Sequence, residues 1–131
     1  MHKIPANTLV VVADGHRARL FRNAGDANEI KLAHENDLSP QDLNDDGPSG
    51  SRPSDSTPKQ SDEATFAKQL AHHLNSGALN SDYEHLALIA DPGTLGEIRP
   101  LLHKTVETRI VVELAKTLTN ATTADIERAL A

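Results

Sequence analysis

A continuous apolar run near the start of the chain is the feature that most constrains the fold. Leu9–Ala13 contains no polar residue, and three of its positions are valine. Such a run is typical of a β-strand that is covered on both faces and lies inside a sheet. Asp14-Gly15 follows directly and is a strong hairpin signal, because glycine reaches positive φ at little cost. The segment 17–22 then alternates in polarity and predicts a second strand paired with the first.

The next part of the chain predicts one more strand and then a long loop. Polar and apolar residues alternate over Ala27–Glu35 after a turn at 23–26, so the first three strands would form an antiparallel meander. Residues 37–60 are rich in proline, glycine, serine and aspartate. We predict a mobile loop there, within a single domain spanning residues 1–131. Such a loop is either functional or a solvated insertion that the fold tolerates.

The second half of the chain predicts alternating helices and strands. Helices are expected at Ser61–Gly77, from Thr94 through Leu102 and from Thr122 or Thr123 onward. Strands are expected between them, at His85–Ala90 and Thr108–Leu114. Thr94 and Glu97 fit a capping box, and Pro100 should bend or break the helix that they open. A strand that follows a helix pairs naturally in parallel with the first strand, through a right-handed crossover. The predicted fold class is α/β, with a five-stranded mixed sheet of order 3-2-1-4-5 and helices packed on its faces.

Composition narrows the possible functions. The chain has no cysteine, which excludes disulfides, thiolate metal sites and a cysteine nucleophile. A net charge of −6 disfavours non-specific nucleic-acid binding by the whole surface but not by a local basic patch. Aromatic residues are scarce, so a base-stacking platform is not expected. The apolar runs are too short for a membrane span or a signal peptide, so we expect a cytoplasmic protein without a membrane partner.

Two aspartates follow the two most apolar predicted strands. Asp14 and Asp91 would project at the same sheet edge, where open α/β sheets bind ligands. A 3-2-1-4-5 sheet with carboxylates at these places is similar to ribonuclease-H-like nucleases, which hold Mg²⁺ there. However, Asp-Gly and Asp-Pro-Gly are ordinary turn sequences, and no third carboxylate is clearly placed beside them. We keep Asp14 and Asp91 as candidates for catalysis or metal binding and favour the turn role.

The densest basic cluster follows the hairpin turn and consists of His16, Arg17, Arg19 and Arg22. Arg17 and Arg19 share a strand face and could bind phosphate. We favour the alternative, in which they pair with acids of the third strand such as Glu29 or Glu35. The histidines show no ligand spacing, because adjacent residues on a helix point about 100° apart and cannot share one ion. No cofactor is expected.

Five segments carry a family resemblance. They are residues 11–21, the acidic loop around Ser51–Ser56, Phe66-Ala67 with Leu70, Leu88–Arg99, and Val111–Leu114 with Lys116, Leu118 and Thr119. In this order they resemble the host-attachment protein family, whose members are described as required for attachment to host cells. The match covers nearly the whole chain, although each segment alone is short.

That family is in turn similar to the middle domain of archaeal and eukaryotic peptide-release factors and of Pelota. In the release factors, the loop after the strand–turn–strand opening carries Gly-Gly-Gln, which enters the peptidyl-transferase centre of the ribosome. Here the corresponding loop offers Gly47–Ser51, and no Gly-Gly-Gln occurs anywhere in the sequence. The resemblance therefore implies a release-factor-like fold, while the missing motif counts against peptidyl-tRNA hydrolysis.

The function that follows from the resemblance is non-catalytic binding. The partner would be the ribosome or an RNA, held by the long loop and the Arg17/Arg19 face, with His16 and Arg52 as further ligand-binding candidates. Two alternatives stay open. One is a divalent-metal-dependent phosphodiester hydrolase that uses Asp14 and Asp91. The other is a protein–protein adaptor whose loop 37–60 binds another protein.

Overall fold

The apolar run Leu9–Ala13 forms β1, the central strand of a five-stranded mixed sheet. The computed structural model, which describes residues 4–39 and 58–130, gives the order β3-β2-β1-β4-β5. β1 pairs antiparallel with β2 (Ala18–Asn23) and in parallel with β4 (Leu86–Ala90). Every residue of β1 is buried, because the strand has neighbours on both sides and is covered on both faces. The predicted α/β class and sheet order are confirmed.

The two edge strands are β3 (Leu32–Leu38), which is antiparallel to β2, and β5 (Ile110–Ala115), which is parallel to β4. The predicted strand at Ala27–Glu35 therefore begins too early. Asn23 Oδ1 accepts hydrogen bonds from the backbone N–H groups of Gly25 and Lys31, at 3.0 and 3.1 Å. This side chain holds the segment before Leu32 in a turn, so the strand starts only after it.

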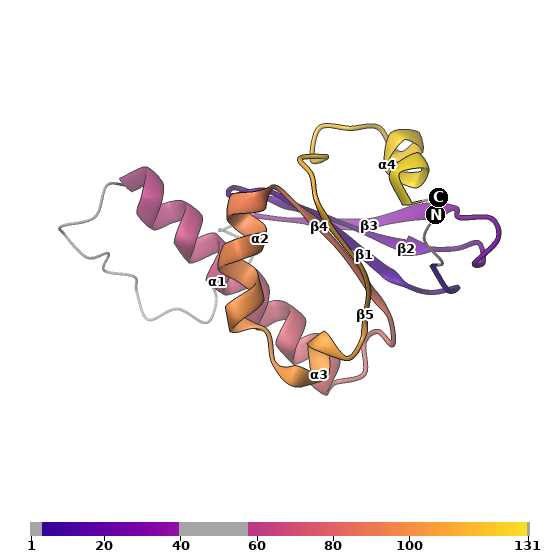
Figure 1. The fold of residues 1–131 in the computed structure, drawn as a ribbon, viewed down its shortest axis with the longest axis horizontal. Coiled ribbons are helices and arrows are strands. Elements are labelled where there is room, and N and C mark those ends of the chain that lie inside the picture. Colours follow the sequence, from indigo (N-terminus) through magenta and orange to yellow (C-terminus); the bar gives the residue numbers. More distant parts are fainter. Residues whose placement is uncertain (1–3, 40–57, 131) are drawn as a thin grey trace.

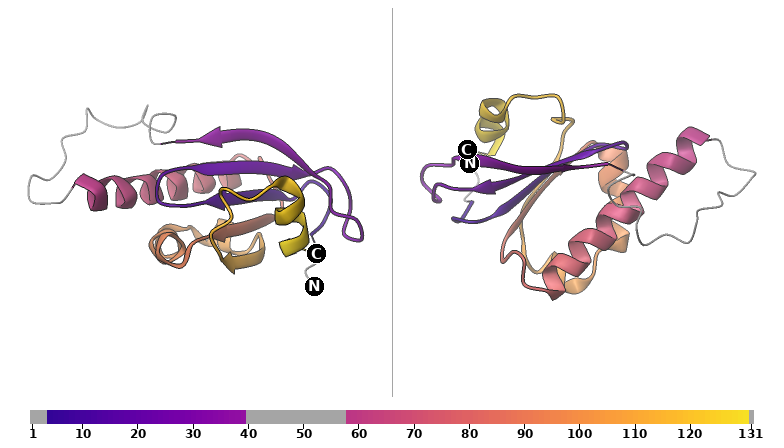
Figure 2. Two further views of the ribbon diagram at one scale, coloured as in Figure 1. Left: turned by 90° about the horizontal axis from the view of Figure 1, so that it is seen from above. Right: turned by 180° about the vertical axis from the view of Figure 1, so that it is seen from behind.

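Helices cover the two faces of the sheet unequally (Figures 1 and 2). One face carries α1 (Pro58–Leu79), α2 (Pro92–Ile98), the 3₁₀ turn η2 (Arg99–Leu101) and α3 (Lys104–Glu107). The other face carries α4 (Thr123–Leu130). None of the helices in the described part of the chain is long and apolar enough to cross a membrane.

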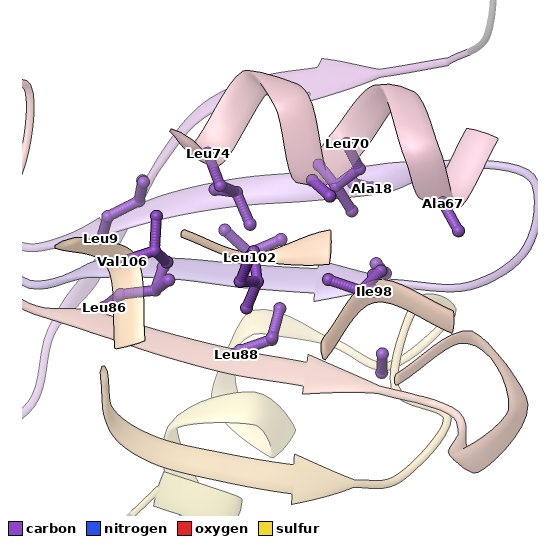
Figure 3. Close-up of a cluster of buried hydrophobic side chains, with 14 of the residues drawn as sticks. Leu9, Ala18, Ala67, Leu70, Leu74, Leu86, Leu88, Ile98, Leu102 and Val106 are labelled. Atoms are coloured by element: carbon purple, nitrogen blue, oxygen red, sulfur yellow. The ribbon is translucent and has the colours of Figure 1, made fainter. Parts of the chain in front are cut away.

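Each face of the sheet has its own core. The larger core lies under α1, whose buried stripe is Phe66, Ala67, Leu70, Ala71 and Leu74, as the sequence predicts (Figure 3). The second core lies under α4, where Ile126 and Leu130 pack on residues of opposite parity from β1 and β4. Neighbouring residues of β1 therefore point into different cores, which explains why its apolar run is unbroken.

The helix boundaries confirm one sequence prediction and correct another. α2 ends at Ile98 and gives way to the 3₁₀ turn that contains Pro100, so the predicted break is confirmed. The helix does not start at Thr94, however. Its N-cap is Asp91, whose Oδ2 accepts the Thr94 backbone N–H at 3.1 Å. The predicted capping box at Thr94 and Glu97 is therefore wrong, because the aspartate that ends β4 also caps the helix.

The predicted mobile loop at 37–60 lies mostly outside the described residues. Its first two positions belong to β3, and residues 58–60 belong to α1, so both of its predicted ends fall inside regular structure. Arg52, a ligand-binding candidate, also lies outside the described residues.

Candidate functional site

Asp14 follows β1 and organises the turn into β2. Its Oδ1 atom accepts the backbone N–H groups of His16 and Arg17, at 2.8 and 2.9 Å. Its Oδ2 atom accepts the hydroxyl of Thr119 at 2.8 Å, from the segment that joins β5 to α4. Burial alone would raise the pKa of Asp14, but the hydrogen bonds from His16, Thr119 and Arg17 outweigh it and lower the pKa. Both carboxylate oxygens thus have structural partners.

Asp91 lies at the same edge of the sheet, as the sequence predicts. β1 and β4 are in parallel register with Ala13 opposite Ala90, so Asp14 and Asp91 follow neighbouring strand ends. One oxygen of Asp91 caps α2, and the other is buried without a hydrogen-bond partner among the described residues. Among the side chains that the structure describes, those of residues 4–39 and 66–130, no group of three or more from aspartate, glutamate, histidine and cysteine could hold a metal ion. This arrangement favours the turn and capping roles over metal chemistry.

The two arginines after the turn reach across to the segment between β5 and α4. Arg17 Nη2 donates to the carbonyl oxygen of Thr119 at 3.1 Å and to Oδ1 of Asn120. Arg19 Nη1 donates to the carbonyl oxygens of Thr119 and Ala121, at 3.3 and 2.9 Å. Together with the bond between Asp14 and Thr119, these contacts join the two ends of the chain. We call this set the clasp: Asp14, Arg17, Arg19, Thr119, Asn120 and Ala121.

The pairing of Arg17 and Arg19 with acids of the third strand is therefore wrong. Glu35 instead forms an ion pair with Arg22, 3.2 Å from its Nε, and Glu29 lies 3.7 Å from Lys31. Arg22 points to the α1 side of the sheet, where it helps to line a half-open pocket of about 290 Å³. Since residues alternate between the two faces of a strand, the basic cluster is split between the faces.

Arg19 is held more tightly than Arg17. Its guanidinium carbon lies 5.1 Å from the centre of the Phe21 ring, which in turn meets the His34 ring edge-on at 5.5 Å. His34 Nε2 is 2.8 Å from a carboxylate oxygen of Asp37. Half-buried and contacted on several sides, Arg19 is mainly a structural residue.

Arg17, in contrast, is exposed and keeps donors for a ligand. A guanidinium carries five N–H groups, of which Arg17 uses the two on Nη2 within the clasp. Its Nε and Nη1 donate to no other described residue. His16 is exposed next to it. Among the predicted ligand-binding residues that the structure describes, Arg17 is thus exposed with N–H groups that donate to no described residue, whereas Arg19 is half-buried.

The sequence reasoning missed Thr119, Asn120 and Ala121. Two of the three contribute backbone carbonyl groups, which every residue type has, so no residue pattern marks them. The neighbouring α4 helix was expected at Thr122 or Thr123, and Thr122 Oγ1 does accept the Asp125 backbone N–H at 3.1 Å. That helix start was therefore visible in the sequence, while the contacts just before it were not.

Comparison with known proteins agrees with the release-factor-like resemblance. Curated proteins give no match to this sequence. A family model described as bacterial archaeo-eukaryotic release factor family 12 matches residues 7–130, which include every strand of the sheet and the whole clasp. The chain therefore belongs to bacterial archaeo-eukaryotic release factor family 12.

Proposed function

We propose that this protein is a non-catalytic binding domain that associates with the translation machinery, through the ribosome or an RNA. The observation that carries the proposal is the combination of a release-factor family match with a sequence that lacks Gly-Gly-Gln. The family match supports the scaffold, and the lack of Gly-Gly-Gln in the sequence counts against peptide release. Binding is the role that such a scaffold can still perform.

The turn at Asp14 and Arg17 supports a contact with nucleic acid. Arg17 is exposed, its backbone is fixed by Asp14, and part of its guanidinium has no partner among the described residues. Arginine on a rigid element is well suited to phosphate, because its guanidinium is always charged and its Nε and Nη1 still carry N–H donors. The formal charges of Asp14, Arg17 and Arg19 sum to +1 in a protein of net charge −6, so this turn is locally more basic than the chain.

A hydrolase that uses Asp14 and Asp91 has less support. Both oxygens of Asp14 already accept hydrogen bonds, and one oxygen of Asp91 caps α2. A metal ion would compete with the donors at Asp14, and the side chains that the structure describes form no group of three that could hold a metal ion. A role in attachment to host cells, which the family resemblance implies, is compatible with binding, because that label describes a phenotype and names no reaction.

The test is co-sedimentation with ribosomes in rising salt, run beside a peptide-release assay. We expect binding without release. If about two phosphates are neutralised, affinity should fall about tenfold between 50 and 200 mM salt, because counterions are released. Arg17→Gln should weaken binding. The matched control is Arg99→Gln, which removes the same charge from an exposed residue of η2, on the opposite side of the sheet.

Each outcome of this test has a definite meaning. Peptide release by the wild-type protein would overturn the non-catalytic half of the proposal. Binding that ignores salt and Arg17→Gln, or no binding to ribosomes or RNA at all, would overturn the other half. Arg19 is less suitable for the test, because it is half-buried and contacts both the Phe21 ring and the 119–121 segment, whereas Arg17 is exposed.

A further inference from the structure

We propose that Arg17 and Asn120 together form a binding site for a single phosphate group of an RNA backbone. The inference rests on the proposed function and specifies the chemistry of its ligand. It adds a residue from the far end of the chain, because Asn120 lies between β5 and α4 and was not a candidate in the sequence.

The geometry fixes which way the Asn120 amide points. Arg17 Nη2 contacts one end of that amide, and a guanidinium has only donors. The atom that faces Arg17 must therefore be the amide oxygen, and the amide nitrogen must point elsewhere. Asn120 is exposed, and its Nδ2 donates to no described residue. Each side chain thus holds the other through one atom and leaves its remaining N–H groups available.

These remaining groups are all hydrogen-bond donors. Nη1 of Arg17 offers two N–H groups and Nε offers one on a different edge of the guanidinium, so a single phosphate would meet Nη1 or Nε but not both; Nδ2 of Asn120 contributes two more. A set of donors beside a positive charge selects an anion with several acceptor oxygens, and a phosphate is such a group. Asp14 keeps its negative charge beside this set, because its hydrogen-bond partners are neutral groups, but the two positive charges of Arg17 and Arg19 exceed it by one.

The clasp also holds the two side chains in place before a ligand arrives. Arg17 is fixed by Asn120 and by the carbonyl oxygen of Thr119, and the Thr119 side chain is fixed by Asp14. Arg19 holds the backbone on the other side of Asn120, through Ala121. Little side-chain freedom is then lost on binding, which favours affinity for a small anion.

Asn120→Asp separates binding from folding. The new carboxylate still accepts the hydrogen bond that Arg17 donates to this side chain, so the clasp should survive. It replaces the amide donors with acceptors and adds a negative charge that repels phosphate. Asn28→Asp is the matched control, because Asn28 is an exposed asparagine in the turn before β3 and undergoes the same change of atoms and charge.

The measurement is an NMR titration that follows the Arg17 Nε–H and Asn120 Nδ2–H₂ signals. Sodium phosphate is compared with sodium chloride at equal ionic strength, and a short single-stranded RNA forms a second arm. We expect saturable shifts of both signals with phosphate and RNA but not with chloride. Affinity should fall about tenfold in Asn120→Asp and stay unchanged in Asn28→Asp.

The remaining outcomes would overturn the inference. These outcomes are an Asn120→Asp variant that titrates like the wild type, chloride that gives the same shifts, and phosphate that binds while RNA does not, which would indicate an adventitious ion only. The two proposals fail in different ways. If wild type and Asn120→Asp sediment equally with ribosomes while Arg17→Gln does not, this inference fails and the proposed function stands. If the wild type binds neither ribosomes nor RNA, the proposed function itself fails.

Discussion

Replacing Asp14 with alanine should destabilise the protein, because it removes the acceptor that links the β1–β2 turn to the segment before α4. Three hydrogen bonds are lost, from the backbone N–H groups of His16 and Arg17 and from the Thr119 hydroxyl. The three donors differ in their environment. The two N–H groups are exposed and can turn to water, whereas Thr119 is only 1% exposed and leaves its hydroxyl without a partner.

The size of the effect follows from that difference. Each exposed bond contributes about 0.5 kcal/mol, and a buried donor left unpaired costs about 2 kcal/mol, which gives about 3 kcal/mol in total. Unfolding entropy of about 2.1 cal/mol/K per residue, applied to the 131 residues of the chain, converts this loss into a fall in Tm of about 11 °C. Asp14→Asn should lose only about 1 kcal/mol, because its oxygen keeps the backbone bonds and its amide can donate to Thr119.

The same substitution predicts a change in pH dependence. The pKa of Asp14 is lowered in the folded protein, so the native state favours the ionised carboxylate. Its contribution to stability is therefore present above the unfolded pKa of 3.8 and is lost as the pH falls through the folded pKa. Asp14→Asn cannot titrate. We therefore expect the wild type to lose part of its advantage over this variant in acid.

Urea denaturation at neutral and acid pH checks both statements. A double-mutant cycle of Asp14→Ala with Thr119→Val isolates the bond between the two side chains and should give a coupling energy of about 1–2 kcal/mol. A coupling near zero, or Asp14→Ala no less stable than Asp14→Asn, would refute the reasoning that the clasp stabilises the fold.

Two further predictions concern stability elsewhere. Asn75 in α1 donates to the Leu101 carbonyl at 3.1 Å and accepts the His103 backbone N–H at 2.8 Å. Asn75→Ala should therefore lower the free energy of unfolding, measured by urea denaturation, by about 2 kcal/mol. An unchanged midpoint would show that these bonds do not secure the 3₁₀ turn. Ser81 has a φ of 59°, in the left-handed region that favours glycine, so Ser81→Gly should stabilise the protein by about 0.5 kcal/mol. Asn7→Gly, at a φ of 67°, should stabilise it less, because asparagine tolerates the left-handed region better than serine. A lower Tm for Ser81→Gly would contradict this prediction.

Sheet order could be predicted because a few strong signals determine it. A strand as apolar as Leu9–Ala13 must lie inside a sheet, and the Asp14-Gly15 turn places its partner on one side. The helix before Leu86–Ala90 then requires a parallel crossover, which places β4 on the other side. Each of these signals is local in the sequence or follows from the general handedness of crossovers. A single sequence is therefore enough to predict the sheet order.

The element boundaries and the clasp depend on side-chain contacts that a sequence pattern does not show. The start of β3 is set by Asn23, which holds a turn of its own chain segment, and α2 is capped by the aspartate that ends β4. Arg17 and Arg19 donate to acceptors far along the chain; Arg17 and Thr119, for example, are 102 residues apart in the sequence. A strand with alternating arginines predicts an exposed basic face equally well, and only the fold shows that this face meets the segment before α4.

The short helix α4 explains why the clasp matters for function as well as stability. An isolated helix of this length is not stable in water, so α4 must be held by tertiary contacts. Ile126 and Leu130 supply the apolar part of that contact, and the clasp supplies a polar part immediately before the helix. The polar part of the contact that holds α4 on the sheet therefore also orients Arg17 and Asn120. Undocking of α4 would disassemble the proposed phosphate site, so ligand binding should in turn stabilise α4 against local opening.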